Sequence, residues 1–237
     1  MPSTNGSMDL TSLTALEGSR SGQTLLGEVA GERCVVRIYA EPGPRGDAAA
    51  EVDAALLRLV RGLVPVPEVL EVRRPDPATG MPALLVTSYA EGVRADALLA
   101  QLDEPGLALA GRALGTLAAT LAAMPVLRPG AFVDADLTVG PWADREPPED
   151  VGRWCLVHGD LGPRTVLLDP DTLAVTALLG WQHAHAGSPV ADLASLLRHE
   201  RRQPFLDAAL AAYCDRLGGT PPEVLALADE ASPPDLA

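Results

Sequence analysis

The feature that most constrains the fold is the stretch 156–193, LVHGDLGPRTVLLDPDTLAVTALLGWQHAHAGSPVADL. An apolar run leads into His158-Gly159-Asp160, and a short turn leads into two apolar stretches joined by Asp169-Pro170-Asp171. Because Asp-Pro-Asp between apolar runs is ordinary turn chemistry, the pattern predicts a strand, a polar loop and a β-hairpin. The phrase GSPVADLA follows, and we expect a helix to begin at Val190.

A strand that ends in HGD, followed by a turn and a hairpin, resembles the catalytic loop of the aminoglycoside phosphotransferase and choline kinase family. The family pattern reads roughly hGDhxxxNhhhd, then hhDW, then GxxxxDLA. The resemblance implies that Asp160 orients or accepts the proton of a substrate hydroxyl. Asp160 and the neighbouring His158 are therefore the candidate catalytic residues, and Asp192 is expected to tie its helix back to the loop.

The two metal-binding positions of the family pattern are changed in this chain. In the family, the loop asparagine and the later aspartate hold the magnesium ions on ATP. The matching positions here are Thr165 and Gly180. Magnesium takes oxygen ligands and usually one or two carboxylates from the protein, and glycine offers no side-chain oxygen. The sequence therefore predicts the fold of a small-molecule kinase with a dismantled metal site, and we assign no metal ligand.

The same resemblance implies an α+β fold with the two lobes of a protein kinase. We expect a small β-rich N-terminal lobe with one helix at 1–92 and a mainly helical C-terminal lobe at 93–237. The second lobe would contain the catalytic-loop hairpin at 156–180. Residues 1–9 are set aside as a disordered or tag-like start.

The N-terminal part supplies candidate nucleotide-binding residues by this resemblance. Residues 24–29 and 34–39 read as strands joined by a turn, and Arg37 occupies the place of a strand cation that pairs with phosphates. Residues 47–63 carry apolar side chains at helical period. Glu51, in the first half of that helix, is the expected partner of Arg37. The alternative is a solvent-exposed glutamate on an amphipathic helix.

Two further stretches match places where the family binds nucleotide. Residues 18–22 lie where the family has its nucleotide-covering loop, although a Gly/Ser hairpin loop is common in any case. Residues 87–92, TSYAEG, fit the hinge between the lobes, where backbone groups would meet adenine. The candidate cofactor-binding residues are Arg37, Glu51, Ser21, Gly22 and Tyr89.

The second half of the chain is predicted to be mainly helical. Residues 94–124 read as a short and a long helix split at Pro105-Gly106, and the long one is apolar on most faces. Residues 125–150 are rich in Pro, Gly, Asp and Glu and lack a period, so we expect a loop. Active family members tend to be longer and helical here, so this region departs from a normal aminoglycoside pocket.

Composition and charge limit the classes of partner that the protein is expected to bind. The net charge of −14 and the sequence pI near 4.6 argue against nucleic acid or an anionic membrane, because both need a basic surface. An acidic surface would suit a cationic ligand or a basic peptide, but commonly it only keeps a protein soluble. The content of Ala, Leu, Val, Pro and Gly is typical of GC-rich bacterial coding.

The cysteines and the hydropathy indicate a cytoplasmic setting. Cys34, Cys155 and Cys214 are widely spaced and odd in number, so neither a disulfide framework nor a zinc site is predicted. No apolar run approaches the roughly 18 to 20 residues of a transmembrane helix, and the N-terminus has no signal-peptide core.

Two other pairs of polar residues are candidate metal ligands. His183 and His185 follow Trp181 and could bind a metal or act as a base, but such histidines are more often surface residues. Asp169 and Asp171 could replace the missing magnesium ligands, yet ordinary turn chemistry explains them better.

Three functions stay open. The first is a degenerate, pseudokinase-like protein whose interlobe cleft binds a small molecule or a peptide. The resemblance adds a context, since phosphotransferase-like proteins work with partner proteins in bacterial lanthipeptide and thioamitide biosynthesis. The second is an active phosphotransferase that uses ATP, magnesium and Asp160 on a hydroxyl. The third is an enzyme repurposed for other chemistry. We favour the first, with no cofactor firmly assigned, because two ligand positions are lost.

Overall fold

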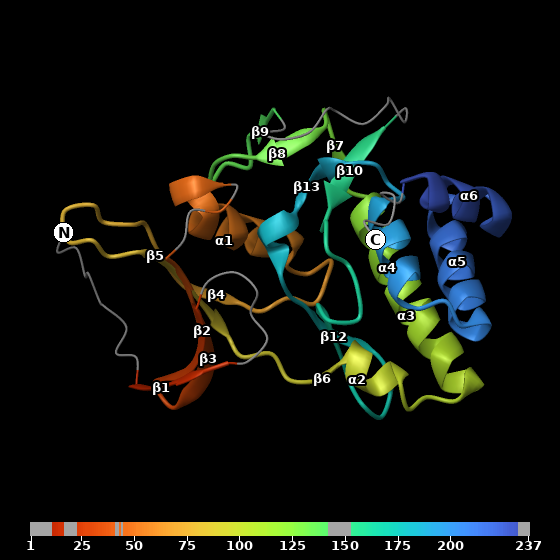
Figure 1. Cartoon of the computed structure of the whole chain (residues 1–237), viewed down its shortest axis with the longest axis horizontal. Coiled ribbons are helices and arrows are strands. Elements are labelled where there is room, and N and C mark those ends of the chain that lie inside the picture. The colour runs from red at the N-terminus through yellow and green to blue at the C-terminus, as the bar shows by residue number, and fades with distance from the viewer. Residues whose placement is uncertain (1–10, 17–22, 41–42, 44, 142–152, 232–237) are drawn as a thin grey trace, which may run out of the picture.

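The structure, a computed structural model, describes residues 11–16, 23–40, 43, 45–141 and 153–231. The chain begins with an antiparallel five-stranded sheet in the order β1-β2-β3-β5-β4 (Figure 1). Its strands are β1 (Thr11–Ala15), β2 (Gln23–Val29), β3 (Glu32–Tyr39), β4 (Val69–Arg73) and β5 (Ala83–Ser88). Ala30 and Gly31 join β2 to β3 with φ of 52° and 86°, as a two-residue hairpin turn requires. This hairpin confirms the two predicted strands.

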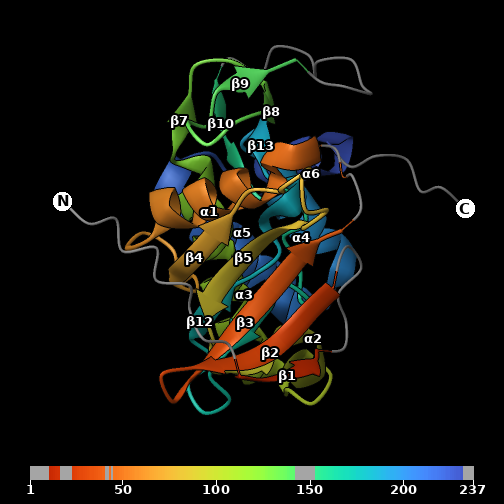
Figure 2. The ribbon, with the colours of Figure 1, turned by 90° about the vertical axis from the view of Figure 1, so that its left-hand side faces the viewer.

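Helix α1 (Ala49–Val60) covers the side of this sheet that faces the rest of the chain. A short 3₁₀ turn, η1 (Gly46–Ala48), precedes it, and α1 contacts β4 and β5 (Figure 2). Its inward stripe includes the fully buried Val52, Leu56 and Val60, which recur at helical spacing. The helix predicted at 47–63 is therefore present, with shorter ends.

The described residues of the second half form five α-helices. They are α2 (Ala95–Leu99), α3 (Glu104–Ala122), α4 (Ala191–His199), α5 (Gln203–Leu217) and α6 (Pro221–Ala231). Pro105 lies in the first turn of α3, and the Asp103 carboxylate caps that turn by accepting the N–H of Gly106 at 2.9 Å. The prediction that Pro105-Gly106 separates two helices is wrong by a few residues, because proline is well tolerated at the start of a helix.

Helices α3 and α5 pack closely because two glycines of α3 face α5. A Cβ at Gly111 would overlap the backbone carbonyl of Phe205, and a Cβ at Gly115 would overlap that of Ala209. The register 111 with 205 and 115 with 209 shows that the two helices run in the same direction. The two glycines therefore allow the backbones of α3 and α5 to approach each other closely.

Two small sheets complete this half. One has the order β7-β10-β13-β8-β9 and the other has the order β12-β11-β6. The strands are β6 (Val93–Arg94), β7 (Pro125–Val126), β8 (Gly130–Phe132), β9 (Val139–Gly140), β10 (Trp154–Val157), β11 (Val166–Leu168), β12 (Val175–Leu178) and β13 (His185–Gly187). The loop predicted at 125–150 is thus corrected, since its described part contains β7, β8 and β9. Strands of two or three residues are too short to show a period.

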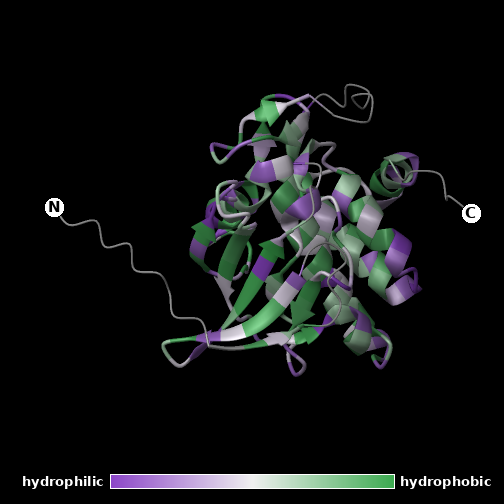
Figure 3. Ribbon diagram, turned by 60° about the vertical axis from the view of Figure 1, so that its left-hand side comes forward, coloured by the Kyte–Doolittle hydropathy of each residue, from purple (hydrophilic) through white to green (hydrophobic). Residues whose placement is uncertain are grey.

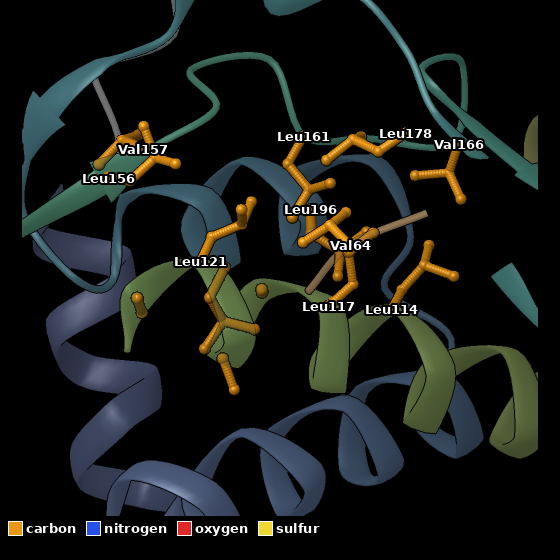
Figure 4. Close-up of a cluster of buried hydrophobic side chains, with 14 of the residues drawn as sticks. Val64, Leu114, Leu117, Leu121, Leu156, Val157, Leu161, Val166, Leu178 and Leu196 are labelled. Carbon is orange, nitrogen blue, oxygen red and sulfur yellow. The ribbon is translucent and has the colours of Figure 1, made fainter. Parts of the chain in front are cut away.

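A single large apolar cluster links the two halves, and the sheet β1–β5 adds a small cluster of its own. Figure 4 shows side chains from α3, α4, β10, β11 and β12 meeting below the catalytic loop, with Leu161 of that loop among them. Helices and strands carry hydrophobic residues beside hydrophilic ones, as elements with one buried face do (Figure 3). None of the described helices has the length and apolarity to span a bilayer. The predicted α+β class, with a β-rich first part and a helical second part, is confirmed. We retain 1–92 and 93–237 as the proposed division.

Candidate functional site

A buried carboxylate on α4 holds the loop that carries Asp160. Asp192 accepts the backbone N–H of His158 at 2.7 Å and that of Gly159 at 3.0 Å. Gly159 has φ +82°, and a Cβ there would overlap the backbone of His183, so the turn needs glycine. Burial raises the pKa of Asp192 to about 6, although the two N–H bonds favour its charged form. The predicted tie between Asp192 and the loop is confirmed.

His158 lies beneath the loop and is fully buried. Its Nε2 lies 2.9 Å from the carbonyl of Leu179, and its Nδ1 accepts the N–H of Asp160 at 3.3 Å. The ring packs edge-on against Trp181 with 4.9 Å between centroids, and burial lowers the pKa of His158 to about 4. A neutral side chain with no exposure cannot touch substrate. The prediction of a catalytic His158 is therefore corrected to a positioning role, whereas Asp160 is exposed.

Thr165, at the asparagine position of the family pattern, closes the same loop. Its Oγ1 accepts the N–H of Gly162 at 3.2 Å and lies 2.8 Å from the carbonyl oxygen of Asp160 and 3.0 Å from that of Gly162. The hydroxyl hydrogen is thus directed at carbonyl groups of the loop. Thr165 acts as a loop-closing residue, and its oxygen is engaged by the backbone.

Gly180, at the aspartate position of the pattern, lies next to Thr165. A Cβ built on Gly180 would be 3.2 Å from Cγ2 of Thr165, so the two positions that match metal ligands in the family pattern meet in space. Neither supplies a carboxylate or an amide, and magnesium requires several well-placed oxygens. Among the described residues, no group of three His, Cys, Asp or Glu side chains could hold a metal ion. The donor set at these positions does not fit magnesium.

The turn aspartates and the two histidines, which are the alternative candidate ligands, have other hydrogen-bond partners. Asp169 Oδ1 accepts the N–H groups of Asp171 at 3.1 Å and Thr172 at 2.8 Å, which is the expected turn chemistry. His183 is exposed at the end of η2 (Trp181–His183), and its carbonyl lies 2.8 Å from Nδ1 of His185. Within the described chain, the two histidines join no metal-binding group.

Arg37 has a different carboxylate neighbour from the one predicted. Its Nη1 lies 3.5 Å from Asp53 Oδ2 and donates to Gln182 Oε1 at 3.1 Å. Glu51 instead accepts a bond from Nε of Arg74 at 2.8 Å. Residues 51 and 53 are about 200° apart around the helix, so only one of them can face inward. The Arg37–Glu51 pair, and with it Glu51 as a site residue, is corrected. An acidic residue on the apolar stripe of α1 was the available signal for Asp53.

No sequence pattern points to Arg45, which joins the sheet-bearing half to the residues after Gly180. Its guanidinium forms an ion pair with Asp53, and the two side chains are 7% and 4% exposed. It also donates to the carbonyls of Ala184 at 2.6 Å and Trp181 at 3.3 Å. Burial lowers the pKa of Arg45, yet arginine stays charged in proteins. A buried cation therefore lies against the segment that follows Gly180.

Tyr39 completes this buried group. Its hydroxyl donates to Asp53 Oδ2 at 2.7 Å, and the guanidinium carbon of Arg37 lies 4.9 Å from its ring centroid. Burial, and then the charge of Asp53, raise the pKa of Tyr39. Asp53 is thus bound by two arginines and a phenol, and the group fixes α1 against β3 and η2.

Of the other predicted nucleotide-binding residues, the structure describes Tyr89, which has partners outside this group. Ser21 and Gly22 lie outside the described residues. The N–H of Tyr89 donates to the carbonyl of Arg33 at 3.1 Å, and the Arg33 guanidinium lies 4.0 Å above the Tyr89 ring while pairing with Glu91. The contact of Tyr89 with nucleotide stays a prediction.

Removal of Arg45 tests the buried ion pair. We expect Arg45→Met to lower the free energy of unfolding by about 3 to 5 kcal/mol, because it leaves Asp53 buried with an incomplete set of partners. Arg74→Met, which breaks the exposed pair with Glu51, should cost less than about 1 kcal/mol. Urea unfolding of both variants measures the difference. Equal losses would contradict the role given to Arg45.

The pH dependence of unfolding tests the loop. Between pH 4 and 6.5 the unfolded state binds more protons at His158, so this group makes stability rise with pH. Between pH 3.8 and 6 the folded state binds more protons at Asp192, so this group makes stability fall as pH rises. The two slopes oppose each other. Asp192→Asn should remove the contribution that falls with pH. The free energy of unfolding of the variant should then rise with pH more steeply than that of the native chain, by up to about 1.4 kcal/mol per pH unit.

Denaturant unfolding at several pH values from 4 to 6.5 measures that slope. Asp171→Asn, the same exchange at an exposed turn position, is the control and should keep the native slope. If the stability of Asp192→Asn depended on pH with the same slope as that of the native chain, the carboxyl of Asp192 would not be the buried proton-binding group.

Comparison with known proteins identifies a matching family and similar structures. A family model described as "Phosphotransferase enzyme family" matches residues 12–227. An aminoglycoside-3'-phosphotransferase of type VIII is 23% identical with a TM-score of 0.65, covering 93% of each chain. A macrolide 2'-phosphotransferase from Brachybacterium faecium is 20% identical, with a TM-score of 0.64 over 94% of this chain and 83% of that one.

A further similar structure is a thermostable mutant of an aminoglycoside phosphotransferase in ternary complex with ADP and hygromycin B. It is 18% identical with a TM-score of 0.62 over 94% of this chain and 85% of that one. A comparison with curated proteins gave no match. The structural likenesses establish the fold, and the family model spans most of the sequence. The chain belongs to the phosphotransferase enzyme family.

Proposed function

We propose that this chain is a pseudokinase-like member of the family, whose site between the two halves binds a ligand without magnesium-dependent phosphoryl transfer. One observation carries the proposal. The two metal-ligand positions lie together, but one is Gly180 and the other, Thr165, has its hydroxyl bound to the loop backbone. Magnesium therefore lacks the oxygens that the family fold would offer it.

Energetics support this choice. Phosphoryl transfer depends on positioning and on metal ions that neutralise charge on the β- and γ-oxygens. Loss of one preorganised charge interaction typically costs about 3 to 4 kcal/mol, or roughly 10²- to 10³-fold in rate. Two such interactions are absent from positions 165 and 180. Asp160 and Arg37 persist, and their retention is more easily understood if the site still binds a ligand.

A second candidate is an ATP-dependent phosphotransferase acting on the hydroxyl of a small molecule or a peptide. The exposure of Asp160 and the complete support of its loop by Asp192 and His158 favour it. Such an enzyme would need to neutralise phosphate charge by other means. The buried Arg45 cannot do so freely, because it already pairs with Asp53.

The ligand class and the setting are also proposals. We propose a small molecule or peptide as the ligand, and a partner protein in a bacterial peptide-modifying complex of the lanthipeptide or thioamitide type as the context. Resemblance to such phosphotransferase-like proteins is its support. The free cysteines Cys34, Cys155 and Cys214 are compatible with a reducing, cytoplasmic compartment.

Restoration of the lost carboxylate tests the proposal. Gly180 has φ 82° and ψ 46°, a left-handed conformation that aspartate tolerates better than most residues. We expect Gly180→Asp to bind Mn²⁺ in the presence of ADP at least about tenfold more tightly than the native chain, because a carboxylate returns beside Thr165. Mn²⁺ titration followed by electron paramagnetic resonance measures the affinity.

Gly62→Asp is the matched control. Gly62 also has a left-handed φ, 88°, and a Cβ there meets nothing within 4 Å. It adds the same charge on the surface and should leave Mn²⁺ affinity unchanged. Tight, ADP-dependent Mn²⁺ binding by the native chain would contradict the proposal, as would equal affinities in the two variants.

A further inference from the structure

The side chain of Gln182 occupies the space next to Gly180. Gln182 lies in η2, and its Oε1 and Nε2 atoms would be 3.8 and 3.9 Å from a Cβ built on Gly180. The third near neighbour of that Cβ is the Cγ2 methyl group of Thr165. A side chain at position 180 would therefore meet a methyl group and an amide group.

A hydrogen bond with Arg37 fixes the orientation of this amide. Nη1 of Arg37 donates to Oε1 of Gln182 at 3.1 Å. A guanidinium has donors only, so the amide atom that faces it is the oxygen, and the NH₂ group faces away from it. Gln182 is half-buried, and among the described residues no group accepts a hydrogen bond from its NH₂ group. Two N–H donors are therefore left for solvent or a ligand.

The buried group around Asp53 has one positive charge in excess. Arg37 and Arg45 are both cations, and they share the single carboxylate of Asp53. Burial raises the pKa of Tyr39, so this phenol stays neutral. The Arg37 side chain is only 19% exposed, which leaves its charge less screened by water than a surface charge. The neutral amide of Gln182 does not cancel this charge, so the space beside it favours a negative group.

The carboxylates outside this group are engaged or exposed. Glu51 pairs with Arg74, and Asp192 accepts two backbone N–H groups of the catalytic loop. Asp160 is exposed, and the described part of the chain shows no ion pair between it and Arg37. Water and salt screen an exposed charge more than a buried one. Asp160 therefore opposes the charge of Arg37 only weakly.

The groups at positions 165, 180 and 182 have the opposite polarity to a magnesium site. Magnesium needs oxygen atoms that accept, and none of the three side chains has one to spare. The Thr165 hydroxyl is bound to the loop backbone, Gly180 has no side chain, and the Gln182 oxygen is bound to Arg37. What remains is an N–H donor group beside a cation. Such donors bind oxyanions directly.

We infer that Gln182 is a specificity-determining residue that binds the ligand, with its NH₂ group donating to an oxyanion held beside Arg37 without a metal ion. The oxyanion is a carboxylate or a phosphate group of the ligand, since both offer the same charged acceptor oxygens. The inference rests on the proposed function in that a ligand occupies this site without magnesium. It adds the chemistry of that ligand and a residue that contacts it.

Labelling of the glutamine side chains with ¹⁵N tests the contact directly by nuclear magnetic resonance. The chain has four glutamines, Gln23, Gln101, Gln182 and Gln203, and Gln182→Ala identifies the signal of Gln182. With EDTA present, we expect pyrophosphate or malonate to shift that signal. The signal of Gln101, which donates to the carbonyl of Ala97, should stay in place. Potassium chloride at the same ionic strength controls for screening and should shift neither.

Calorimetric titration in EDTA measures the affinity for the oxyanion that binds more tightly. Gln182→Ala should weaken binding at least about tenfold, because a hydrogen bond to a charged group is lost. Gln182→Glu should weaken it further, because a carboxylate beside Arg37 repels the oxyanion. Gln203→Ala makes the alanine exchange at an exposed position of α5 and should leave the affinity within about twofold. Thermal unfolding checks that the variants are folded.

Tighter binding of pyrophosphate would point to a phosphate group on the ligand, and tighter binding of malonate to a carboxylate; either result supports the inference. It is overturned if neither oxyanion binds, or if one binds while the Gln182 signal stays in place. Native affinity in Gln182→Ala would also overturn it, by leaving Gln182 a purely structural role.

The chelator separates this test from the Mn²⁺ test of the proposed function. Tight, ADP-dependent Mn²⁺ binding by the native chain would reject the proposed function, whereas the oxyanion titration contains no metal. Absence of oxyanion binding in EDTA would reject this inference and leave the Mn²⁺ result unchanged.

Discussion

The buried carboxylate of Asp192 is the interaction on which the site depends. It binds two consecutive backbone N–H groups, so the turn that presents Asp160 is fixed from α4 and not by a bound ligand. His158 supports the same turn from below, with each ring nitrogen bound to the backbone. A polar loop over an apolar core is stable when its buried donors and acceptors are satisfied.

On the side of the site formed by α1 and β3, the buried carboxylate of Asp53 plays the same part as that of Asp192. Two arginines and a phenol surround this carboxylate, and Arg45 extends the group to the carbonyls of Trp181 and Ala184. These contacts link α1 and β3 to the residues that follow Gly180. Thr165 closes the catalytic loop with its hydroxyl, and Gly180 takes a left-handed backbone conformation that suits glycine.

The sequence was informative where a short-range pattern decides the structure. Alternation, helical period and turn residues predicted the β2–β3 hairpin, α1 and the hairpin after Asp160, and the family motif located Asp160 and Asp192. The strands β7, β8 and β9 escaped because two or three residues show no period. These elements are defined by their partners in the fold.

Side-chain pairing was harder to predict than element type. Glu51 and Asp53 lie on one helix, and only the orientation of α1 against the sheet decides which carboxylate meets Arg37. Arg45 stands among turn residues and has no pattern around it, so its burial follows from the packing of η2 against α1.

We propose that this phosphotransferase fold holds no magnesium at positions 165 and 180. Thermal unfolding of the native chain with millimolar ATP, with magnesium or with a chelator, tests it most directly. A ligand at a hundred times its dissociation constant stabilises by about 2.7 kcal/mol, and each kcal/mol shifts Tm by roughly 2 to 4 °C in a chain of this size. We predict that magnesium changes Tm by less than about 1 °C whatever ATP does alone. A magnesium-dependent rise of about 5 °C or more would contradict the account.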